Sequence, residues 1–163
     1  MSPTPTIRPA EESDVPRLAQ LWFDGWQDAH LGLLPESVRR ARTLASFERR
    51  LIDALGDIRV ATRDDRLNGF VMLREAELYQ FYVDASARGS GVAQQLMAET
   101  ERWLAARGFA ESFLDCAIGN DRAARFYEKC GWQRQGIVES TLDLDGVAVT
   151  IKIWRYVKRL TAR

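Results

Sequence analysis

The stretch AELYQFYVDASARGSGVAQQLM, residues Ala76–Met97, decides how this chain folds. It begins with an apolar and aromatic run that ends at Val83, crosses two glycines at Gly89 and Gly91, and becomes apolar again from Val92. This pattern predicts a buried strand, a tight turn and a helix. Because glycine has no side chain, the first amides of the helix can approach a ligand closely and point at it.

The turn has the chemistry of a phosphate site. Unpaired amides at a helix N-terminus and the positive end of the helix dipole attract phosphate. Arg88, just before the glycines, adds a permanently charged fork that suits phosphate geometry. The sequence therefore predicts a phosphorylated cofactor at residues 88–93. The alternative is that the glycines serve only the turn, as they often do between a strand and a helix.

Two common phosphate motifs do not explain the turn. No Gly-Lys-Ser/Thr follows the glycines, so the segment is not a P-loop, and Gln94 stands where a dinucleotide fingerprint has its third glycine. The pattern Arg88-Gly-Ser-Gly91-Val-Ala93 instead resembles Gln/Arg-x-x-Gly-x-Gly/Ala, the acetyl-CoA-binding signature of the GNAT superfamily of N-acetyltransferases. The resemblance implies that CoA is bound by Arg88, Gly89, Ser90, Gly91, Val92 and Ala93.

Length and charge limit the class of protein. The 163 residues fit one domain, which we expect to span residues 1–163 with a flexible tail at residues 1–5. Lys and Arg number 23, as do Asp and Glu, so no net charge favours nucleic acid or an anionic membrane. The N-terminal residues lack the pattern of a signal peptide, and no apolar run is long enough to span a bilayer. We therefore expect a cytoplasmic protein that binds neither nucleic acid nor membrane.

The residues that bind metals or act as thiol nucleophiles are scarce. Cys116, Cys130 and His30 are too dispersed for a zinc cluster or a Cys–His nucleophile pair. We interpret both cysteines as small buried hydrophobic residues, and we expect no metal.

Hydrophobic periodicity and turn residues predict the remaining elements. The predicted helices cover roughly residues 11–32, 37–55, 91–107 and 122–129. The predicted strands cover roughly residues 7–10, 58–62, 68–74, 76–83 and 111–118, followed by a hairpin whose strands are separated by Asp145-Gly146. This order indicates an α+β fold of three α/β layers, in which helices flank a mixed, mainly antiparallel sheet. It is similar to the order of the GNAT acyl-CoA N-acyltransferase fold over nearly the whole chain.

Residues 120–132 carry a second motif. The sequence Asn120-Asp-Arg-Ala-Ala-Arg-Phe-Tyr127-Glu-Lys-Cys-Gly-Trp132 resembles the GNAT pattern Asn-x-x-Ala-x-x-Phe-Tyr-x-x-x-Gly-Phe, with Trp in place of the last Phe. The resemblance implies that Asn120 contacts the pantetheine arm of CoA and that Tyr127 lies near the thioester sulfur. Asn120 is also a good helix N-cap, and the alternative role for Tyr127 is packing beside its aromatic neighbour.

The strand before the signature has a further implied role. In the GNAT family its backbone amides hold the pantetheine and polarise the acyl carbonyl, and the matching positions are Phe81, Tyr82 and Val83. The alternative is that these three residues belong only to the core of the sheet.

Acyl transfer from a thioester to an amine adds two requirements. Attack by the amine creates an oxyanion and then expels a thiolate, which a nearby O–H such as that of Tyr127 can protonate. An amine with a pKa near 10.4 must also lose a proton, which costs on the order of 4–5 kcal/mol at neutral pH. Glu77 matches the position where several GNAT enzymes carry a catalytic glutamate. Glu75 and Asp84 are weaker candidates, and the alternative for Glu77 is an exposed strand-end carboxylate.

The acceptor pocket is the least defined part of the prediction. In the GNAT family the first helices and the last hairpin border this pocket, so the resemblance places Trp22, Trp26, His30 and Tyr79 there. Tryptophans at helical spacing also suit a core. We interpret the arginines of residues 37–55 as a solvated face rather than as an anion-binding patch.

The sequence thus predicts an acetyl-CoA-dependent N-acetyltransferase that acts on a primary amine of a small molecule or peptide by direct attack in a ternary complex. Its predicted partners are acetyl-CoA and the amine, and a homodimer is left open. The sequence does not identify the amine or exclude another acyl-CoA. The alternatives are a non-catalytic acyl-CoA-binding module and, disfavoured by the incomplete fingerprint, a nucleotide-binding oxidoreductase.

Overall fold

The computed structural model describes residues 4–30, 32–144 and 146–161. Residues 1–3 of the predicted tail and Asp145 of the predicted final turn lie outside the described residues. Within the described ranges, no helix is both long enough and apolar enough to cross a membrane.

Seven strands form one sheet in the order β1-β2-β3-β4-β5-β7-β6. The strands are β1 (Thr6–Pro9), β2 (Ile58–Arg63), β3 (Arg66–Arg74), β4 (Glu77–Val83), β5 (Glu111–Ala117), β6 (Gln133–Leu144) and β7 (Val147–Arg159). All neighbouring pairs are antiparallel except β4 and β5, which are parallel. The prediction of a mixed, mainly antiparallel sheet is confirmed.

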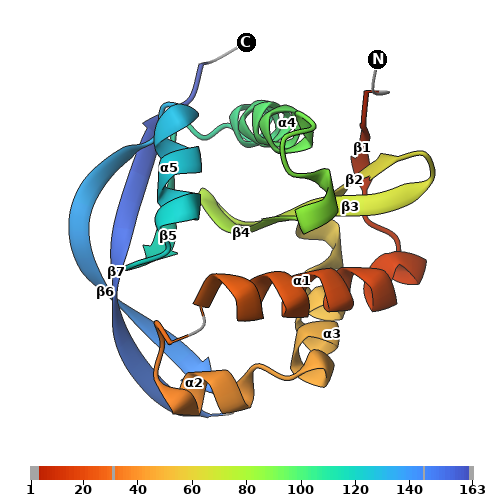
Figure 1. The fold of residues 1–163 in the computed structure, drawn as a ribbon. Coiled ribbons are helices and arrows are strands. Elements are labelled where there is room, and N and C mark those ends of the chain that lie inside the picture. The colour runs from red at the N-terminus through yellow and green to blue at the C-terminus, as the bar shows by residue number, and fades with distance from the viewer. Residues whose placement is uncertain (1–3, 31, 145, 162–163) are drawn as a thin grey trace.

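Helices cover both faces of this sheet. They are α1 (Val15–His30), α2 (Glu36–Ala41), α3 (Leu44–Asp53), α4 (Val92–Ala106) and α5 (Asp121–Lys129), with short 3-10 turns at Glu12–Asp14, Leu55–Asp57 and Ala85–Ala87. Figure 1 shows β4 between α4 on one face and α1 with α3 on the other. One buried cluster joins α1, α2 and α3 to the sheet, and a second joins α4 and α5 to it. The molecule therefore has the three predicted layers.

The sequence of β3 shows how the sheet serves both cores. Phe70 and Met72 pack in the cluster with α1 and α3, whereas Val71 and Leu73 pack in the cluster with α4. Side chains along a strand alternate between its faces, so a strand covered on both faces has consecutive apolar residues, as β3 does from Phe70 to Leu73.

The predicted helix over residues 37–55 is wrong as a single element. The structure divides it into α2 and α3, because Thr43 has an extended backbone with φ −90° and ψ 163°. The Thr43 hydroxyl accepts a hydrogen bond from the Ser46 amide at 3.1 Å and caps α3. A threonine N-cap inside an otherwise periodic stretch therefore starts a new helix.

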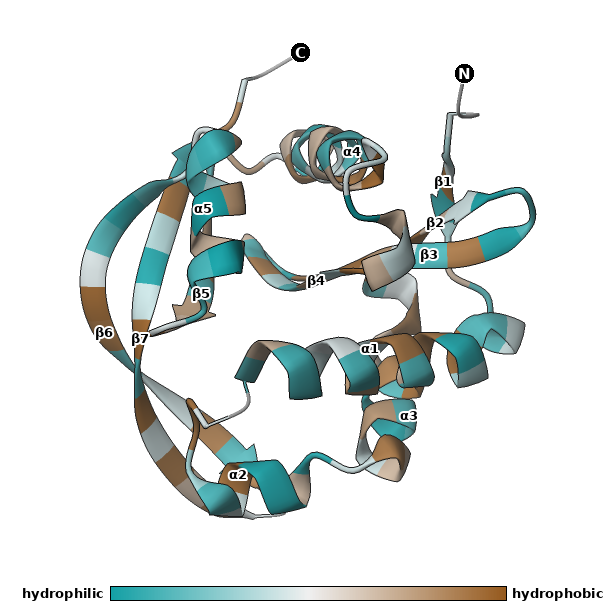
Figure 2. Cartoon of the chain, in the orientation of Figure 1, coloured by the Kyte–Doolittle hydropathy of each residue, from teal (hydrophilic) through white to brown (hydrophobic). Residues whose placement is uncertain are grey.

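The final hairpin is confirmed, since β6 pairs with β7 from Gln133 to Leu144. Hydrophilic and hydrophobic residues alternate along both strands (Figure 2). Figure 1 shows the far end of this hairpin beside α2. There Leu144 is buried in the same cluster as Val38 of α2, so this end of the hairpin packs against α2.

Candidate active site

The sheet opens between its two parallel strands. Glu77 and Phe113 form the register pair of β4 and β5, at the beginning of both strands, and β5 is otherwise paired with β7 from Glu111 to Ala117. A cleft of about 1590 Å³ lies at this opening. Drug-sized ligands usually occupy about 300–1,000 Å³. The cleft is therefore large enough for a long ligand and a second, smaller one.

We divide the cleft into two halves by the helices that border them. The α4 half is defined by Gly89, Gly91, Ala93, Asn120 and Tyr127, and the α3 half by His30, Arg50, Arg74, Glu77 and Tyr79. Phe81, Tyr82 and Val83 of β4 line the cleft as well.

The backbone of β4 presents amides to the opening. The Asp84 amide donates to the Asn68 carbonyl oxygen at 2.8 Å, on the β3 side of the strand. Because successive amides of a strand point to opposite neighbours, the amides of Phe81 and Val83 face the β5 side. The Tyr82 amide faces β3. Of the three predicted β4 positions, Phe81 and Val83 therefore supply the donors that a ligand in the opening can reach.

One extra residue bends β4 at the opening. Met72 of β3 pairs with Gln80, whereas Leu73 pairs with Leu78, so Tyr79 is the additional residue of a β-bulge. A bulge redirects a side chain and increases the local twist. Here it puts Tyr79 against the cluster of α1 and α3 and into the cleft.

The loop before α4 has several amides free for a ligand. The amides of Arg88 and Ser90 donate to the carbonyl oxygens of Ala85 and Ala87, at 3.2 Å each. By contrast, among the described residues no protein group accepts from the amides of Gly89, Gly91, Val92 and Ala93. Gly91 is the N-cap of α4 with φ 90°, and Gly89 has φ 76°, so both need the conformational freedom of glycine. These amides are the donors that the predicted anion site requires.

The other predicted residues of the loop differ in what they present to the cleft. The Ser90 hydroxyl donates to the Ala87 carbonyl, and the Val92 side chain is fully buried in the core. Val92 therefore offers its backbone and not its side chain. The Ala93 and Arg88 positions line the cleft.

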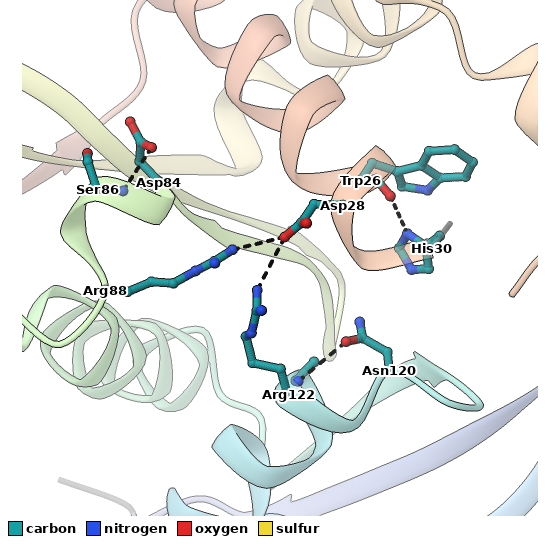
Figure 3. A network of polar contacts seen from close by, with 9 residues as sticks. Trp26, Asp28, His30, Asp84, Ser86, Arg88, Asn120 and Arg122 are labelled. Carbon is teal, nitrogen blue, oxygen red and sulfur yellow. Dashed lines mark hydrogen bonds and ion pairs between the residues drawn. The ribbon is translucent and has the colours of Figure 1, made fainter. Parts of the chain in front are cut away.

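Arg88 reaches across the cleft to α1. Its guanidinium donates to Asp28 Oδ2 at 3.1 Å, and Arg122 of α5 donates to the same oxygen at 3.2 Å (Figure 3). The Arg88 hydrogen bond lowers the pKa of Asp28, which keeps the carboxylate charged. Asp28 of α1 thus holds two guanidinium groups at the α4 half, one from the loop before α4 and one from α5.

Asn120 and Tyr127 come to the same half from α5. The Asn120 side-chain oxygen accepts from the Ala123 amide at 3.4 Å, so this residue caps α5 and also lines the cleft. The Tyr127 ring lies 5.8 Å from that of Phe126, and within the described chain its hydroxyl has no hydrogen-bond partner. Burial raises the pKa of Tyr127, so the phenol keeps its proton.

Both cysteines have thiols that resist ionisation. Burial raises the pKa of Cys116 to about 11, and it also raises the pKa of Cys130. Cys116 is 4% exposed although it borders the cleft. A thiol must ionise to act as a nucleophile, so neither cysteine is suited to carry an acyl group.

Of the three carboxylates that the sequence offers for proton transfer, Glu77 is half-buried and lines the cleft. Burial and the nearby Asp115 raise its pKa, and Arg74 and Arg155 partly oppose this. Asp115 is held by Arg155 at 2.9 Å.

The two weaker candidates lie elsewhere. Glu75 is exposed in the hairpin turn, and Asp84 caps a 3-10 turn and pairs with Arg17 at 2.8 Å. Neither residue is among those that line the cleft.

Three of the four predicted acceptor residues line the cleft, namely Trp26, His30 and Tyr79. The His30 Nδ1 donates to the Trp26 carbonyl oxygen at 3.0 Å, and burial lowers the pKa of His30, so the ring is neutral near pH 7 (Figure 3). Trp22 does not line the cleft. Its side chain is 0% exposed, because it packs between Phe47 and Phe70 in the core.

The arginines of the α3 half were not predicted as site residues. Arg49 and Arg50 of α3 and Arg74 of β3 all line the cleft, although the helical arginines were expected on a solvated face. No local signal distinguishes them from Arg39 and Arg40, because the packing of α3 on α1 decides which arginines face the cleft.

Comparison with known proteins shows the family of this chain. The model of the Acetyltransferase (GNAT) family matches residues 16–132. An aminoglycoside N(6')-acetyltransferase type 1 from Stenotrophomonas maltophilia is 31% identical over 133 residues, which cover 79% of this chain and 86% of the relative.

Two solved structures have the same fold. A GCN5-related N-acetyltransferase from Rhodopseudomonas palustris matches with a TM-score of 0.75 and 23% identity, covering 98% of both chains. The PaiA N-acetyltransferase from Thermoplasma acidophilum, in complex with coenzyme A, matches with a TM-score of 0.66 and 20% identity over 96% of this chain and 99% of that one. The chain belongs to the GNAT family of N-acetyltransferases.

Proposed function

We propose that this enzyme transfers the acetyl group of acetyl-CoA to a primary amine of a small molecule or peptide, by direct attack while both substrates are bound. The observation that carries the proposal is the opening between β4 and β5, which joins a group of free amides to a half-buried carboxylate and an unpaired phenol. In the PaiA complex, a protein of the same fold binds coenzyme A.

The α4 half fits the cofactor. The free amides of Gly89, Gly91, Val92 and Ala93 would hold the pyrophosphate, with Arg88 as a charged donor. The outward amides of Phe81 and Val83 would hold the pantetheine arm and polarise the acetyl carbonyl, where negative charge develops during attack. Asn120 adds a polar side chain on the opposite wall of the opening. Acetyl-CoA supplies the activated thioester, and the protein holds the thioester in position.

Two side chains manage the protons. Glu77 accepts the surplus proton of the attacking amine, which then forms the new bond from nitrogen to the carbonyl carbon as the carbon–sulfur bond breaks. Tyr127 donates its hydroxyl proton to the departing thiolate, and its raised pKa ensures that the proton is present. The acylated nitrogen then loses its remaining extra proton, which returns Tyr127 to the protonated phenol. The products are an N-acetyl amine and CoA. The inert thiols of Cys116 and Cys130 favour this direct route over an acyl-enzyme.

The test is release of free CoA from acetyl-CoA with a panel of amines, amino acids, peptides, polyamines and an aminoglycoside, with mass spectrometry of the acetylated product. We expect turnover of at least one class. Tight binding of acetyl-CoA with no turnover of any amine would instead identify an acyl-CoA-binding module. A nicotinamide cofactor in the same binding assay tests the oxidoreductase alternative, and we expect no binding.

A further inference from the structure

We propose that the acceptor is a small primary amine that also carries a carboxylate or a phosphate, and that Arg50 and Arg74 bind this anionic group. The inference rests on the proposed acetyl transfer and adds the charge of the acceptor.

Tyr79 holds the two guanidinium groups together. The Arg74 guanidinium carbon lies 3.5 Å from the centre of the Tyr79 ring, and the Arg50 Nη2 donates to the Tyr79 hydroxyl at 2.6 Å. The Arg50 guanidinium is also 4.4 Å from the Trp22 ring. These contacts fix the orientation of both arginines before any ligand binds, which reduces the entropy lost on binding.

Both guanidinium groups retain donors for a ligand. Arginine has five N–H donors in a planar fork. Within the described residues, no carboxylate forms an ion pair with Arg50 or Arg74, whereas Asp115 in the same cleft is paired with Arg155. An oxyanion between Arg50 and Arg74 would therefore take up donors that the protein leaves unused.

The other charged groups facing this site do not neutralise it. Arg49 adds a third positive charge from α3. Within the described chain, the unpaired acids nearby are Asp53 at the exposed end of α3 and Glu77 beside Arg74, whereas Asp57 pairs with Arg107 and Asp115 with Arg155. Burial raises the pKa of Tyr79, but the charges of Arg50, Arg74 and Arg42 outweigh burial and the pKa is lowered. Local positive charge is therefore large enough to favour an anion.

The anion site lies beside the proposed proton acceptor. Arg74 and Glu77 are register partners in the β3–β4 hairpin, and such partners have Cβ atoms about 4.5–5.5 Å apart on the same face. A smaller hollow of about 260 Å³ next to the cleft is lined by Arg50, Arg74 and Tyr79 as well. An amine at Glu77 and an anion at the arginines would thus be separated by the length of a small molecule such as an amino acid.

The wall formed by β6 also carries acids. Glu139 and Asp143 of β6 line the cleft, and Asp143 accepts from the Gly146 amide at 2.8 Å. Negative charge on this wall attracts the amine end of the acceptor, and positive charge at Arg50 and Arg74 attracts its acidic end. The cleft is therefore complementary to a zwitterion.

The experiment compares matched pairs that differ only in the anion. One type of pair tests the carboxylate and compares α-amino acids with their carboxamides. The other type tests the phosphate and compares phosphoethanolamine with ethanolamine. Spermidine is the cationic probe. We expect kcat/KM to be about ten- to hundredfold higher for the anionic member of one pair type, and to be lowest for spermidine. Equal or better turnover of the carboxamides, ethanolamine or spermidine overturns the inference while acetyl transfer stands.

Variants locate the effect in the protein. Arg74→Gln should bring the ratio of kcat/KM between the anionic and the neutral member of a pair close to one, and the exposure of Arg74 makes a folding defect a poor explanation. Arg50→Lys keeps the charge but loses the fork, and should weaken the preference less. Arg39→Gln is the matched control, because this exposed arginine of α2 does not line the cleft. A preference that survives Arg74→Gln contradicts the assignment.

Equilibrium binding separates this inference from the proposed function. The same pairs are titrated into the CoA-saturated protein and into its Arg74→Gln variant. Selective binding of the anionic members that is lost in the variant supports the inference, even if no pair is turned over. Selective binding without turnover would count against the proposed acetyl transfer but not against the anion site. Absence of binding, or equal binding of both members, overturns the inference.

Discussion

The two halves of the cleft are built from different parts of the polypeptide. In the α4 half the groups offered to a ligand are mainly backbone amides, at Gly89, Gly91 and their neighbours, within one short loop. In the α3 half they are side chains brought together from α1, α3 and the β3–β4 hairpin. Backbone amides are the same whatever the side chains, so one half suits a constant ligand. The other half can change its ligand by single substitutions.

The largest expected effect is in the α3 half, at the proton acceptor. Glu77→Gln should lower kcat by about 10²–10⁴-fold, because it removes the base, while the Kd for acetyl-CoA stays nearly constant. The deprotonated carboxylate is the active form, so activity should fall as pH drops through a pKa above the ordinary glutamate value. The variant should lose this ionisation from the pH–rate profile. Glu75→Gln, in the adjacent exposed turn, is the control, and full turnover with the parental profile in Glu77→Gln would assign Glu77 to structure only.

A smaller loss is expected at Tyr127, where the α4 half contributes a side chain rather than an amide. Tyr127→Phe removes only the hydroxyl, so we expect kcat to fall by about 10²-fold with little change in CoA affinity. Tyr156→Phe is the control. Its ring lies 6.1 Å from that of Tyr127, but its hydroxyl bonds Glu128 and Arg134 outside the cleft. Equal activity of Tyr127→Phe and wild type would leave Tyr127 with a packing role.

The backbone character of the α4 half is tested by adding a side chain there. Gly91→Trp should weaken CoA binding by about tenfold or more, because the side chain occupies the space before free amides and disturbs their orientation. Gly108→Trp has nearly the same backbone strain, with φ 95° against 90°, and likewise has open space around its Cβ position. It lies at the other end of α4, so calorimetry should show unchanged CoA affinity. Similar affinities in the two variants would argue against a phosphate site at Gly91.

The smallest effect concerns the contact that sets α1 against β4 and so joins the two halves. A Cβ atom on Gly25 would lie 2.6 Å from Cδ1 of Tyr82. Overpacking costs about 1–3 kcal/mol, and the higher helix propensity of alanine offsets about 1 kcal/mol of it. We therefore expect Gly25→Ala to lower the free energy of unfolding by about 1 kcal/mol in denaturant titrations. Gly56→Ala, where nothing lies within 4 Å, should not be destabilised, and an equally stable Gly25→Ala would show that Tyr82 moves without cost.

The difference between the two halves of the cleft also explains which features the sequence predicts and which it does not. The glycine turn, the Asn120 cap and the strand before the turn are local patterns, and the structure forms each of them. The break at Thr43 also has a local signal, a threonine three residues before Ser46, which the apolar periodicity conceals. The packing of α1, α3 and β3 decides which α3 arginines face the cleft, and it also buries Trp22. Helical spacing alone does not contain that information.

Residue-resolved amide hydrogen exchange, measured by NMR with and without CoA, tests the central claim most directly. Among the amides of the loop, those of Gly89, Gly91, Val92 and Ala93 have no protein acceptor, whereas those of Arg88 and Ser90 are already bonded. CoA should therefore slow exchange at the first group and at Phe81 and Val83, and leave Arg88, Ser90 and Tyr82 nearly unchanged. Protection that spreads evenly over the loop, or that is absent from the first group in CoA-saturated protein, would contradict a cofactor held by these backbone amides.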